Sequence, residues 1–291
     1  MKRLTGIILI AISATGFGTL AIFGRFLYAA GLDTLTLLFF RFALSASVLT
    51  VILLLRREPL PRGRVLAQLI GMGALGYAGQ SFTYLSAIKY ASAGLVALLL
   101  YLYPTLVFIL SAIFLREKVT WIKVGALTLA LLGTGLTVGP AGGQALGILY
   151  AVASALIYSI YIIVGASVMK KVSAIQSSLV IFTSAALVYG TLTAINGVHF
   201  PITNSGWWSL AGIVIIATVI PVVAFLAGLE RIGPTNASLL STLEPVVTVL
   251  LAAWLFAERL EPITLLGGAL ILVAVLVLTR SEMKVPVQPE A

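Results

Sequence analysis

The chain contains no cysteine, a single histidine and few charged residues. Without cysteine it can form neither a disulfide framework nor a thiolate metal site. One histidine, His199, also excludes a His-Glu-x-x-His zinc motif, and no Walker A sequence is present. Asp, Glu, Lys and Arg make up 9% of the residues, against roughly 25% in soluble domains. So few charges cannot cover a water-facing surface, so lipid must face most of the chain.

The charges that are present are mainly positive, with 18 Lys and Arg against 9 Asp and Glu. On a soluble protein this excess would suggest a nucleic-acid partner. Here the positive residues lie in short breaks between apolar runs and form no patch with aromatic residues. This distribution is typical of the positive-inside bias of multi-pass membrane proteins, so we predict a bilayer partner and no nucleic acid.

The apolar runs predict an all-α membrane protein with ten transmembrane helices. About 20 mainly apolar residues cross a bilayer as a helix. Charged, glycine-rich or proline-containing breaks separate the runs, and His199 lies in the polar break from Asn196 to Gly206. The predicted spans are 4–28, 34–55, 65–88, 92–115, 121–138, 146–168, 175–195, 207–229, 235–256 and 262–280.

The distribution of positive charge predicts the orientation. The first apolar run, 4–27, is longer than the core of a signal peptide, so it is interpreted as a retained helix. With the N-terminus in the cytoplasm, every Lys and Arg except Arg25, Arg41, Lys89 and Arg259 falls on the cytoplasmic side. We therefore predict both termini in the cytoplasm of a bacterial-type cell, with the chain in its inner membrane.

One constant spacing divides the chain into two copies of one unit. Pro104 and Pro245 lie 141 residues apart (245 − 104 = 141), and the same offset relates Glu117 to Glu258 and Gly6 to Gly147. The predicted units are 1–140 and 141–281, followed by a disordered polar tail, 282–291. Five spans per unit is an odd number, so the second unit is predicted to run inverted across the membrane, as in many transporters.

These features together resemble the EamA family of the drug/metabolite transporter superfamily. The resemblance implies ten spans in two halves and secondary transport of small metabolites, often amino-acid export. The hairpin glutamates Glu117 and Glu258 follow Arg116 and Ala257, where the family often has glycine. The matching pieces are Gly6 with Ser13 to Gly18, Arg41-Phe42, Ala91 to Gly94, Pro104 with Leu115 to Lys118, and Pro245 with Phe256 to Arg259.

Polar side chains within the spans form stripes that predict a substrate path. In a bilayer such side chains should face protein or a water-filled cavity. The alternative for each stripe is hydrogen bonding between helices, at about 0.6 kcal/mol per contact. Helical spacing places on common stripes Tyr77, Gln80, Ser81 and Tyr84; Ser154, Tyr158 and Tyr161; and Ser238, Ser241 and Thr242. The fourth span adds the polar candidates Tyr101, Tyr103 and Thr105.

Two charges are predicted inside spans. Glu244 lies in the ninth span, where a charge costs on the order of 2.5–3.5 kcal/mol unless it is paired, protonated or hydrated. It could be a proton site, a contact for a substrate ammonium group or a structural acceptor. Arg41, in the second span, could be a structural anchor or a substrate contact.

Glycines and prolines mark irregular points in the predicted helices. Gly71 to Gly76 matches the dinucleotide-binding glycine pattern, but it lies in a span with no preceding strand. Close helix packing is the better interpretation. Pro104, Pro221 and Pro245 interrupt spans four, eight and nine, where they could act as hinges or simply as packing kinks.

The sequence therefore predicts a secondary transporter with no cofactor, no metal and no enzymatic activity. The predicted substrate is a small molecule, an amino acid (aromatic ones among the candidates) or a related metabolite, exported by alternating access. Efflux of drug-like cations is the alternative transport function. An intramembrane lipid-modifying enzyme would need a richer set of reactive side chains than Arg41 and Glu244. A receptor or scaffold would need an extramembrane domain.

Overall fold

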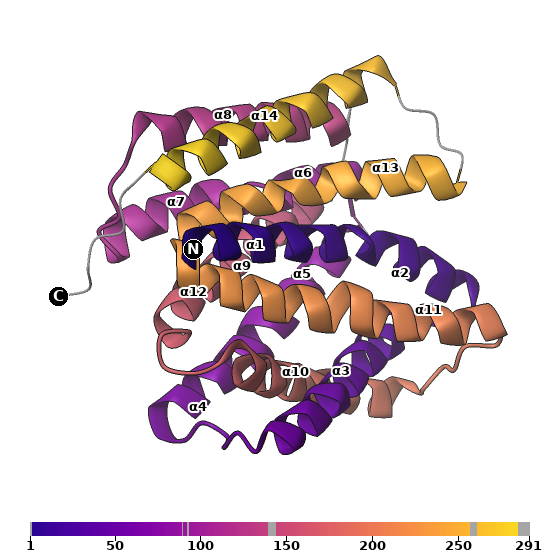
Figure 1. Cartoon of the computed structure of the whole chain (residues 1–291). Coiled ribbons are helices and arrows are strands. Elements are labelled where there is room, and N and C mark those ends of the chain that lie inside the picture. The colour runs from indigo at the N-terminus through magenta and orange to yellow at the C-terminus, as the bar shows by residue number, and fades with distance from the viewer. Residues whose placement is uncertain (1, 89, 92, 139–143, 257–260, 285–291) are drawn as a thin grey trace.

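A computed structural model describes residues 2–88, 90–91, 93–138, 144–256 and 261–284, and within these ranges the elements are all helices (Figure 1). The predicted hairpin tip at 258–261 lies largely outside these ranges, as do residues 285–291 of the predicted tail. The first half contains α1 (Lys2–Gly18), α2 (Leu20–Ala29), α3 (Thr34–Arg56), α4 (Gly63–Gly71), the π-helix η1 (Met72–Tyr77), α5 (Ala78–Ile88), α6 (Ala93–Leu100), α7 (Tyr103–Phe114) and α8 (Trp121–Val138).

The second half repeats this series of helices. It contains α9 (Ala145–Val168), α10 (Ala174–Asn196), α11 (Asn204–Val214), the π-helix η2 (Ile215–Val219), α12 (Ile220–Leu240), the 3-10 helix η3 (Ser241–Leu243), α13 (Glu244–Phe256) and α14 (Pro262–Lys284). Three pairs of helix starts keep the offset of 141: α4 and α11 begin at Gly63 and Asn204, α7 and α13 at Tyr103 and Glu244, and α8 and α14 at Trp121 and Pro262. The helix α14 continues to Lys284, so the predicted tail begins at least three residues too early.

Within the described part of the chain, six helical stretches are long and apolar enough to cross a membrane. They are Lys2–Ala29, Thr34–Arg56, Ala145–Val168, Ala174–Asn196, Asn204–Leu255 and Pro262–Ser281, and two shorter apolar helices are Tyr103–Phe114 and Trp121–Leu136. Multi-pass membrane character is thus confirmed. The count of ten spans stays a prediction, because the predicted spans 207–229 and 235–256 form one continuous helical stretch that bends at Gly233 (φ 79°).

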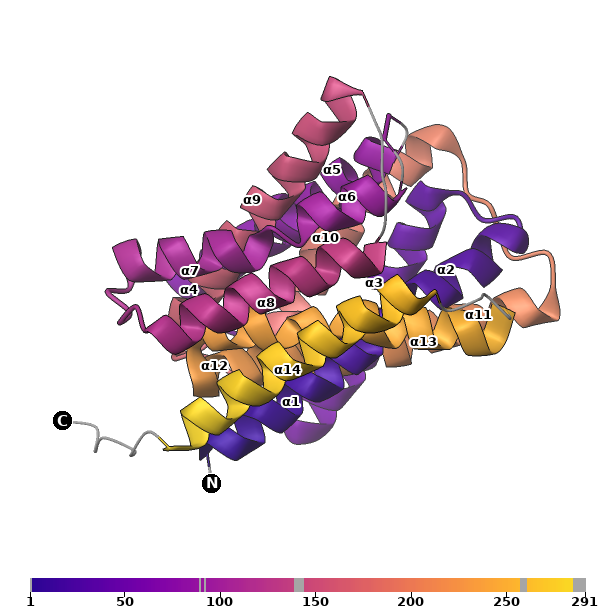
Figure 2. The same ribbon diagram turned by 90° about the horizontal axis from the view of Figure 1, so that it is seen from above.

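Equivalent helices of the two halves pack against one another. The helix α8 packs on α14 and α3 packs on α10, and each pair joins an element to its own counterpart. The helix α1 packs on α12, and its counterpart α9 packs on α5. This exchange of partners is what a two-fold relation between the halves requires. Figures 1 and 2 show α8 beside α14, with the start of α1 and the end of α14 on the same side of the molecule.

The two π-helices occur at matching places in the two halves. Residue 77, the last residue of η1, corresponds to residue 218 in η2 (218 − 77 = 141). Each π-helix interrupts a long helix without ending it, a feature that is frequent at functional sites. At η1 the backbone lies directly on α10, since a Cβ on Gly73 would come within 2.5 Å of the Ile181 carbonyl oxygen. Gly73 therefore permits close helix packing, as predicted, whereas a Cβ on Gly71 would meet no atom within 4 Å.

Candidate functional site

Arg41 connects the two π-helices inside the protein. It lies on α3 and its side chain is 5% exposed. Its Nε donates a 2.7 Å hydrogen bond to Thr218 Oγ1, and one terminal nitrogen donates a 3.3 Å bond to the Tyr77 hydroxyl. The guanidinium also lies 5.1 Å from the Phe42 ring centre, which adds a cation–π contact.

The two partners of Arg41 occupy equivalent positions of the repeat, because Tyr77 and Thr218 are separated by the offset of 141. Thr218 Oγ1 in turn donates a 2.7 Å bond to the Ile213 carbonyl, five residues earlier in the widened turn of η2. One arginine thus fixes both irregular turns at the contact between the halves. This geometry favours the structural-anchor role for Arg41 over a direct substrate contact.

A continuous row of aromatic rings extends from Arg41 through the interior. Tyr77 lies 5.7 Å from Tyr161, which stacks at 5.9 Å on Tyr158. Tyr158 meets Tyr103 edge-on at 4.8 Å, and Tyr103 lies 6.3 Å from Tyr101. The structure therefore brings together predicted site residues from η1, α7 and α9. We call Tyr77, Tyr101, Tyr103, Tyr158 and Tyr161 the tyrosine row.

Glu244 lies beside the tyrosine row at the first position of α13 and is half-buried. Its electrostatic field reaches the hydroxyl groups of Tyr77, Tyr101, Tyr103 and Tyr158, and the field of Arg41 acts on it. Among the residues that the structure describes, its carboxylate accepts no hydrogen bond and forms no ion pair within 4 Å. A half-buried carboxylate without a protein partner is available to a proton, to water or to a cation.

Gln80 and Ser81 continue the polar stripe of span three into α5. The Gln80 amide donates to Ser154 Oγ at 3.3 Å, and the Ser154 hydroxyl donates to the Gln80 carbonyl at 3.1 Å. Ser81 Oγ donates to the Gln80 side-chain oxygen at 3.4 Å. Tyr84 is half-buried and lies within electrostatic range of Glu244 and Tyr101. Gln80 thus joins α5 to α9, the helix that carries Tyr158 and Tyr161.

Ser241 and Thr242 use their hydroxyl protons within their own helix. Ser241 donates to the Ala237 carbonyl at 2.9 Å and Thr242 to the Leu239 carbonyl at 2.7 Å. Both side chains are buried, at 4% and 2% exposure. Their donors are not available to a substrate, so a binding role for this pair has little structural support.

The three prolines lie where the helices are irregular. Pro104 and Pro245 occupy the second positions of α7 and α13, directly after the turn at 101–102 and after η3. Pro221 is the second residue of α12 and directly follows η2. At these positions the missing N–H is tolerated. The predicted interruptions are therefore present, and a hinge role for them stays a prediction.

Two features of this region were missed by the sequence reasoning. Thr218 was not a candidate, because one threonine in an apolar run is a weak signal; the offset of 141 from Tyr77 would have pointed to it. Two cavities, of about 840 and 200 Å³, lie outside the tyrosine row.

Within the described ranges, no group of three or more His, Asp or Glu side chains gathers that could hold a metal ion.

Comparisons with known proteins agree with this architecture. The EamA-like transporter family matches residues 4–139 and 145–280, one match per half. An uncharacterized transporter of Archaeoglobus fulgidus is 30% identical over 274 residues, covering 93% of this chain and 95% of its relative. The uncharacterized transporter YcbK of Bacillus subtilis is 24% identical, covering 90% and 88%. A solved structure, titled only as the crystal structure of a protein, matches with a TM-score of 0.83 and 22% identity. The match covers 97% of this chain and 99% of the chain in that structure, and it supports the fold alone.

Proposed function

Because this chain belongs to the EamA-like transporter family, we propose that it is a secondary transporter that exports amino acids or related small metabolites. The observation that carries the proposal is the Glu244 carboxylate, which lies within electrostatic range of the tyrosine row and has no hydrogen-bond or ion-pair partner among the described residues. A substrate ammonium group would find a carboxylate together with aromatic faces, which attract cations by about 0.5–2 kcal/mol. An aromatic substrate side chain could stack on the same rings.

The second charge of an amino acid needs hydrogen-bond donors. The hydroxyls of the tyrosine row are neutral donors within electrostatic range of Glu244, and Gln80 adds a side-chain amide that bonds to Ser154 on α9. Arg41 is already engaged by Tyr77 and Thr218. We therefore assign the ammonium end of the substrate to Glu244 and the carboxylate end to the Gln80 side. The substrate-contact set is Tyr77, Gln80, Ser81, Tyr84, Tyr101, Tyr158, Tyr161 and Glu244.

Alternating access is the proposed mechanism, with ten spans in two inverted repeats. The packing of helices on their own counterparts supports a two-fold relation between the repeats. The chain-terminal ends of α1 and α14 lie on one side of the molecule, whereas α11 begins on the opposite side (Figure 1). This placement supports termini on one face of an inner membrane and a loop at 196–206 on the other. Pro104, Pro221 and Pro245, each beside an irregular turn, are the proposed hinges.

Efflux of drug-like cations is the alternative. It uses the same carboxylate and tyrosines but has no need of a donor for a substrate carboxylate. The family name also identifies a transporter, which is consistent with the absence of an enzymatic role.

Flux into proteoliposomes tests the proposal. Purified protein is reconstituted, and uptake of labelled aromatic and aliphatic amino acids is compared with uptake of organic cations. The proposal expects saturable amino-acid flux that falls strongly in Glu244→Gln. Cation flux without amino-acid flux would favour the alternative, and flux unchanged by Glu244→Gln would remove Glu244 from the site.

A further inference from the structure

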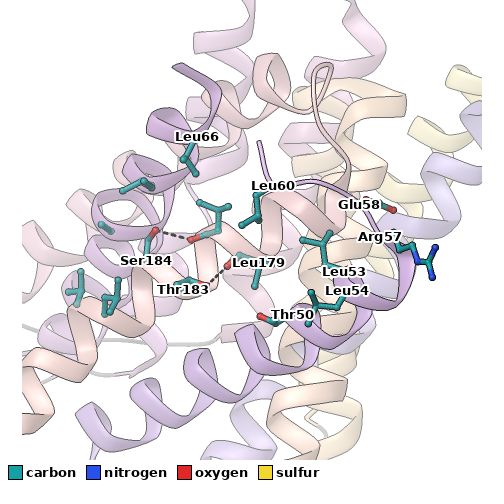
Figure 3. A pocket seen from close by; sticks show the side chains of 15 residues that line it. Thr50, Leu53, Leu54, Arg57, Glu58, Leu60, Leu66, Leu179, Thr183 and Ser184 are labelled. Carbon is teal, nitrogen blue, oxygen red and sulfur yellow. Dashed lines mark hydrogen bonds between the residues drawn. The ribbon is translucent and has the colours of Figure 1, made fainter. Parts of the chain in front are cut away.

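The larger cavity lies away from the tyrosine row, between α3, α4, η1 and α10 (Figure 3). Its volume is about 840 Å³, in the range of small-molecule sites. We call it the α3–α10 groove. Its walls consist mainly of aliphatic side chains, and two of these residues, Leu54 and Leu187, are 71% and 67% exposed. In a protein that spans a membrane, side chains of this kind face the acyl chains of lipid.

The groove offers an occupant almost no hydrogen bonding, although three hydroxyls line it. Thr50 donates to the Ala46 carbonyl, Thr183 to Leu179 and Ser184 to Val180, each at 2.8 Å. Figure 3 shows the last two bonds. Because each hydroxyl proton is used on its own helix, the walls present an apolar surface. The interior of the groove therefore suits a hydrocarbon chain.

The rim of the groove is different, because the loop 57–62 carries unpaired positive charge. Glu58 is occupied: it pairs with Arg56 at 3.7 Å and accepts a 3.0 Å hydrogen bond from Ser173. The side chain of Arg57, which lines the rim, makes no hydrogen bond or ion pair with any described residue, and its guanidinium points outward in Figure 3. The side chains of Arg62 and Arg64 are also exposed, and they likewise have no hydrogen-bond or ion-pair partner among the described residues.

The rim is held in place by the neighbouring loop before α10. Besides the bond from Ser173, the Gln176 side chain donates a 2.6 Å hydrogen bond to the Pro59 carbonyl. The exposed lysines Lys170 and Lys171 lie on this second loop and add to the positive charge. A cationic rim above an apolar groove is complementary to an amphiphile with an anionic head.

We propose that the α3–α10 groove binds an anionic phospholipid, with one acyl chain between α3 and α10 and the phosphate at Arg57 and Arg62. Arginine recognises phosphate through charge-assisted hydrogen bonds, and basic residues near an anionic membrane surface are attracted to it. A cationic amphiphile would be repelled by the rim, and a neutral lipid would gain only the contacts of its chain. The acyl chain of the lipid would touch Ala74 of η1, the π-helix that also carries Tyr77. This inference needs membrane insertion but no particular transport substrate.

Photocrosslinking of the purified full chain in detergent tests the proposal. The probe is phosphatidylglycerol with a diazirine in one acyl chain, and adducts are located by peptide mass spectrometry. Adducts should fall in α3, α4–η1 and α10. Unlabelled phosphatidylglycerol should compete about tenfold better than phosphatidylcholine of the same chains, and inorganic phosphate should not compete. Adducts spread over other helices, equal competition by both lipids, or stronger competition by a cationic amphiphile would overturn the proposal.

Variants test recognition of the lipid head group and of the acyl chain separately. In the double variant Arg57→Gln with Arg62→Gln, the preference for phosphatidylglycerol should disappear while labelling persists. The matched control is Arg280→Gln, at an exposed position on α14, and this variant should keep the preference for phosphatidylglycerol. Ala74→Phe should fill the groove and abolish labelling by both lipids. Should that variant not fold, Leu187→Trp at the exposed wall serves the same purpose. A preference for phosphatidylglycerol that survives the double variant, or labelling that survives the filled groove, would refute the site.

Discussion

Arg41 Nε donates a 2.7 Å hydrogen bond to Thr218 Oγ1, although the two residues lie 177 positions apart. Through this bond and the bond to Tyr77, one cation in the first half fixes a π-helix in each half. A buried charge of this kind is stabilised only by the partners that surround it. We infer that loss of either partner affects the relative placement of the halves more than the stability of a single helix.

The first prediction concerns stability. Thr218→Val should lower the free energy of unfolding by about 1–3 kcal/mol, because it leaves a charged donor without its acceptor. Thr218→Ser, which keeps the hydroxyl, should recover most of this loss. Thermal unfolding in detergent provides the measurement. Thr128→Val on α8 is the control, since its exposed hydroxyl bonds only to the Val124 carbonyl of its own helix. Equal shifts for Thr218→Val and Thr128→Val would show that Arg41 does not need Thr218.

Much of this fold could be predicted from the sequence, because composition and repetition act along the whole chain. Because the chain has few charges, most of its surface had to face lipid, and this predicted membrane-spanning helices. The offset of 141 predicted equivalent positions in the two halves, such as the helix starts at Tyr103 and Glu244. The π-helices could not be predicted, since no proline or charge within Met72–Tyr77 marks the change of turn. The Arg41–Thr218 bond depends on how α3 meets η2, which no local pattern encodes.

Ser241 and Thr242 show a second limit of sequence reasoning. Helical periodicity places them correctly on one stripe, but it does not say which acceptor a hydroxyl will choose. Short hydroxyl side chains compete for nearby backbone carbonyls, and both residues bond within their own helix. Gln80 has a longer side chain and reaches Ser154 on another helix instead.

The second prediction concerns orientation in the membrane. In the cysteine-free chain, Asn204→Cys should react with an impermeant thiol reagent in intact cells, whereas Lys171→Cys should react only after permeabilisation. Both positions are exposed, so access is decided by the membrane and not by burial. The positive charge of the predicted cytoplasmic loops is the physical reason. The opposite labelling pattern would reverse the predicted topology.

The third prediction separates substrate contact from packing on α5. Gln80→Ala and Tyr84→Phe should each reduce transport several-fold, because they remove polar groups of the predicted stripe on α5, whereas Phe82→Ala, at a side chain that is 49% exposed, should not. Initial flux per folded protein in proteoliposomes is the measurement.

Gln80 also bonds to Ser154, so a matched variant is needed for this third prediction. Ser154→Ala removes the contact between α5 and α9 but keeps the Gln80 amide. If Gln80 serves only as a packing contact, Ser154→Ala and Gln80→Ala will lower transport and thermal stability alike. A substrate contact predicts a raised KM in Gln80→Ala alone.

The last prediction concerns the charge of Glu244. Its carboxylate has no hydrogen-bond or ion-pair partner among the described residues, and it lies within electrostatic range of Arg41 and of Tyr101. A group in this position can take up a proton or bind a substrate ammonium group as the site opens to either side. Glu244→Gln keeps the shape and hydrogen bonding of the side chain but removes its titration. We therefore expect a folded variant with at least tenfold lower flux, of the size that about 1.4 kcal/mol of lost interaction produces, and a flattened dependence of flux on pH.

The control for Glu244 is Glu230→Gln, because Glu230 lies at the surface of α12 and pairs only with Arg231 at 3.5 Å. Initial flux is measured across a series of pH values for the three proteins, with thermal unfolding as the test of folding. Proton coupling predicts that the pH dependence flattens in Glu244→Gln alone. A lower flux with an unchanged pH profile would instead assign Glu244 to ammonium binding and not to proton coupling. Wild-type flux with a wild-type pH profile would leave the carboxylate without a role in transport, and the coupling site would then have to lie on residues other than this glutamate.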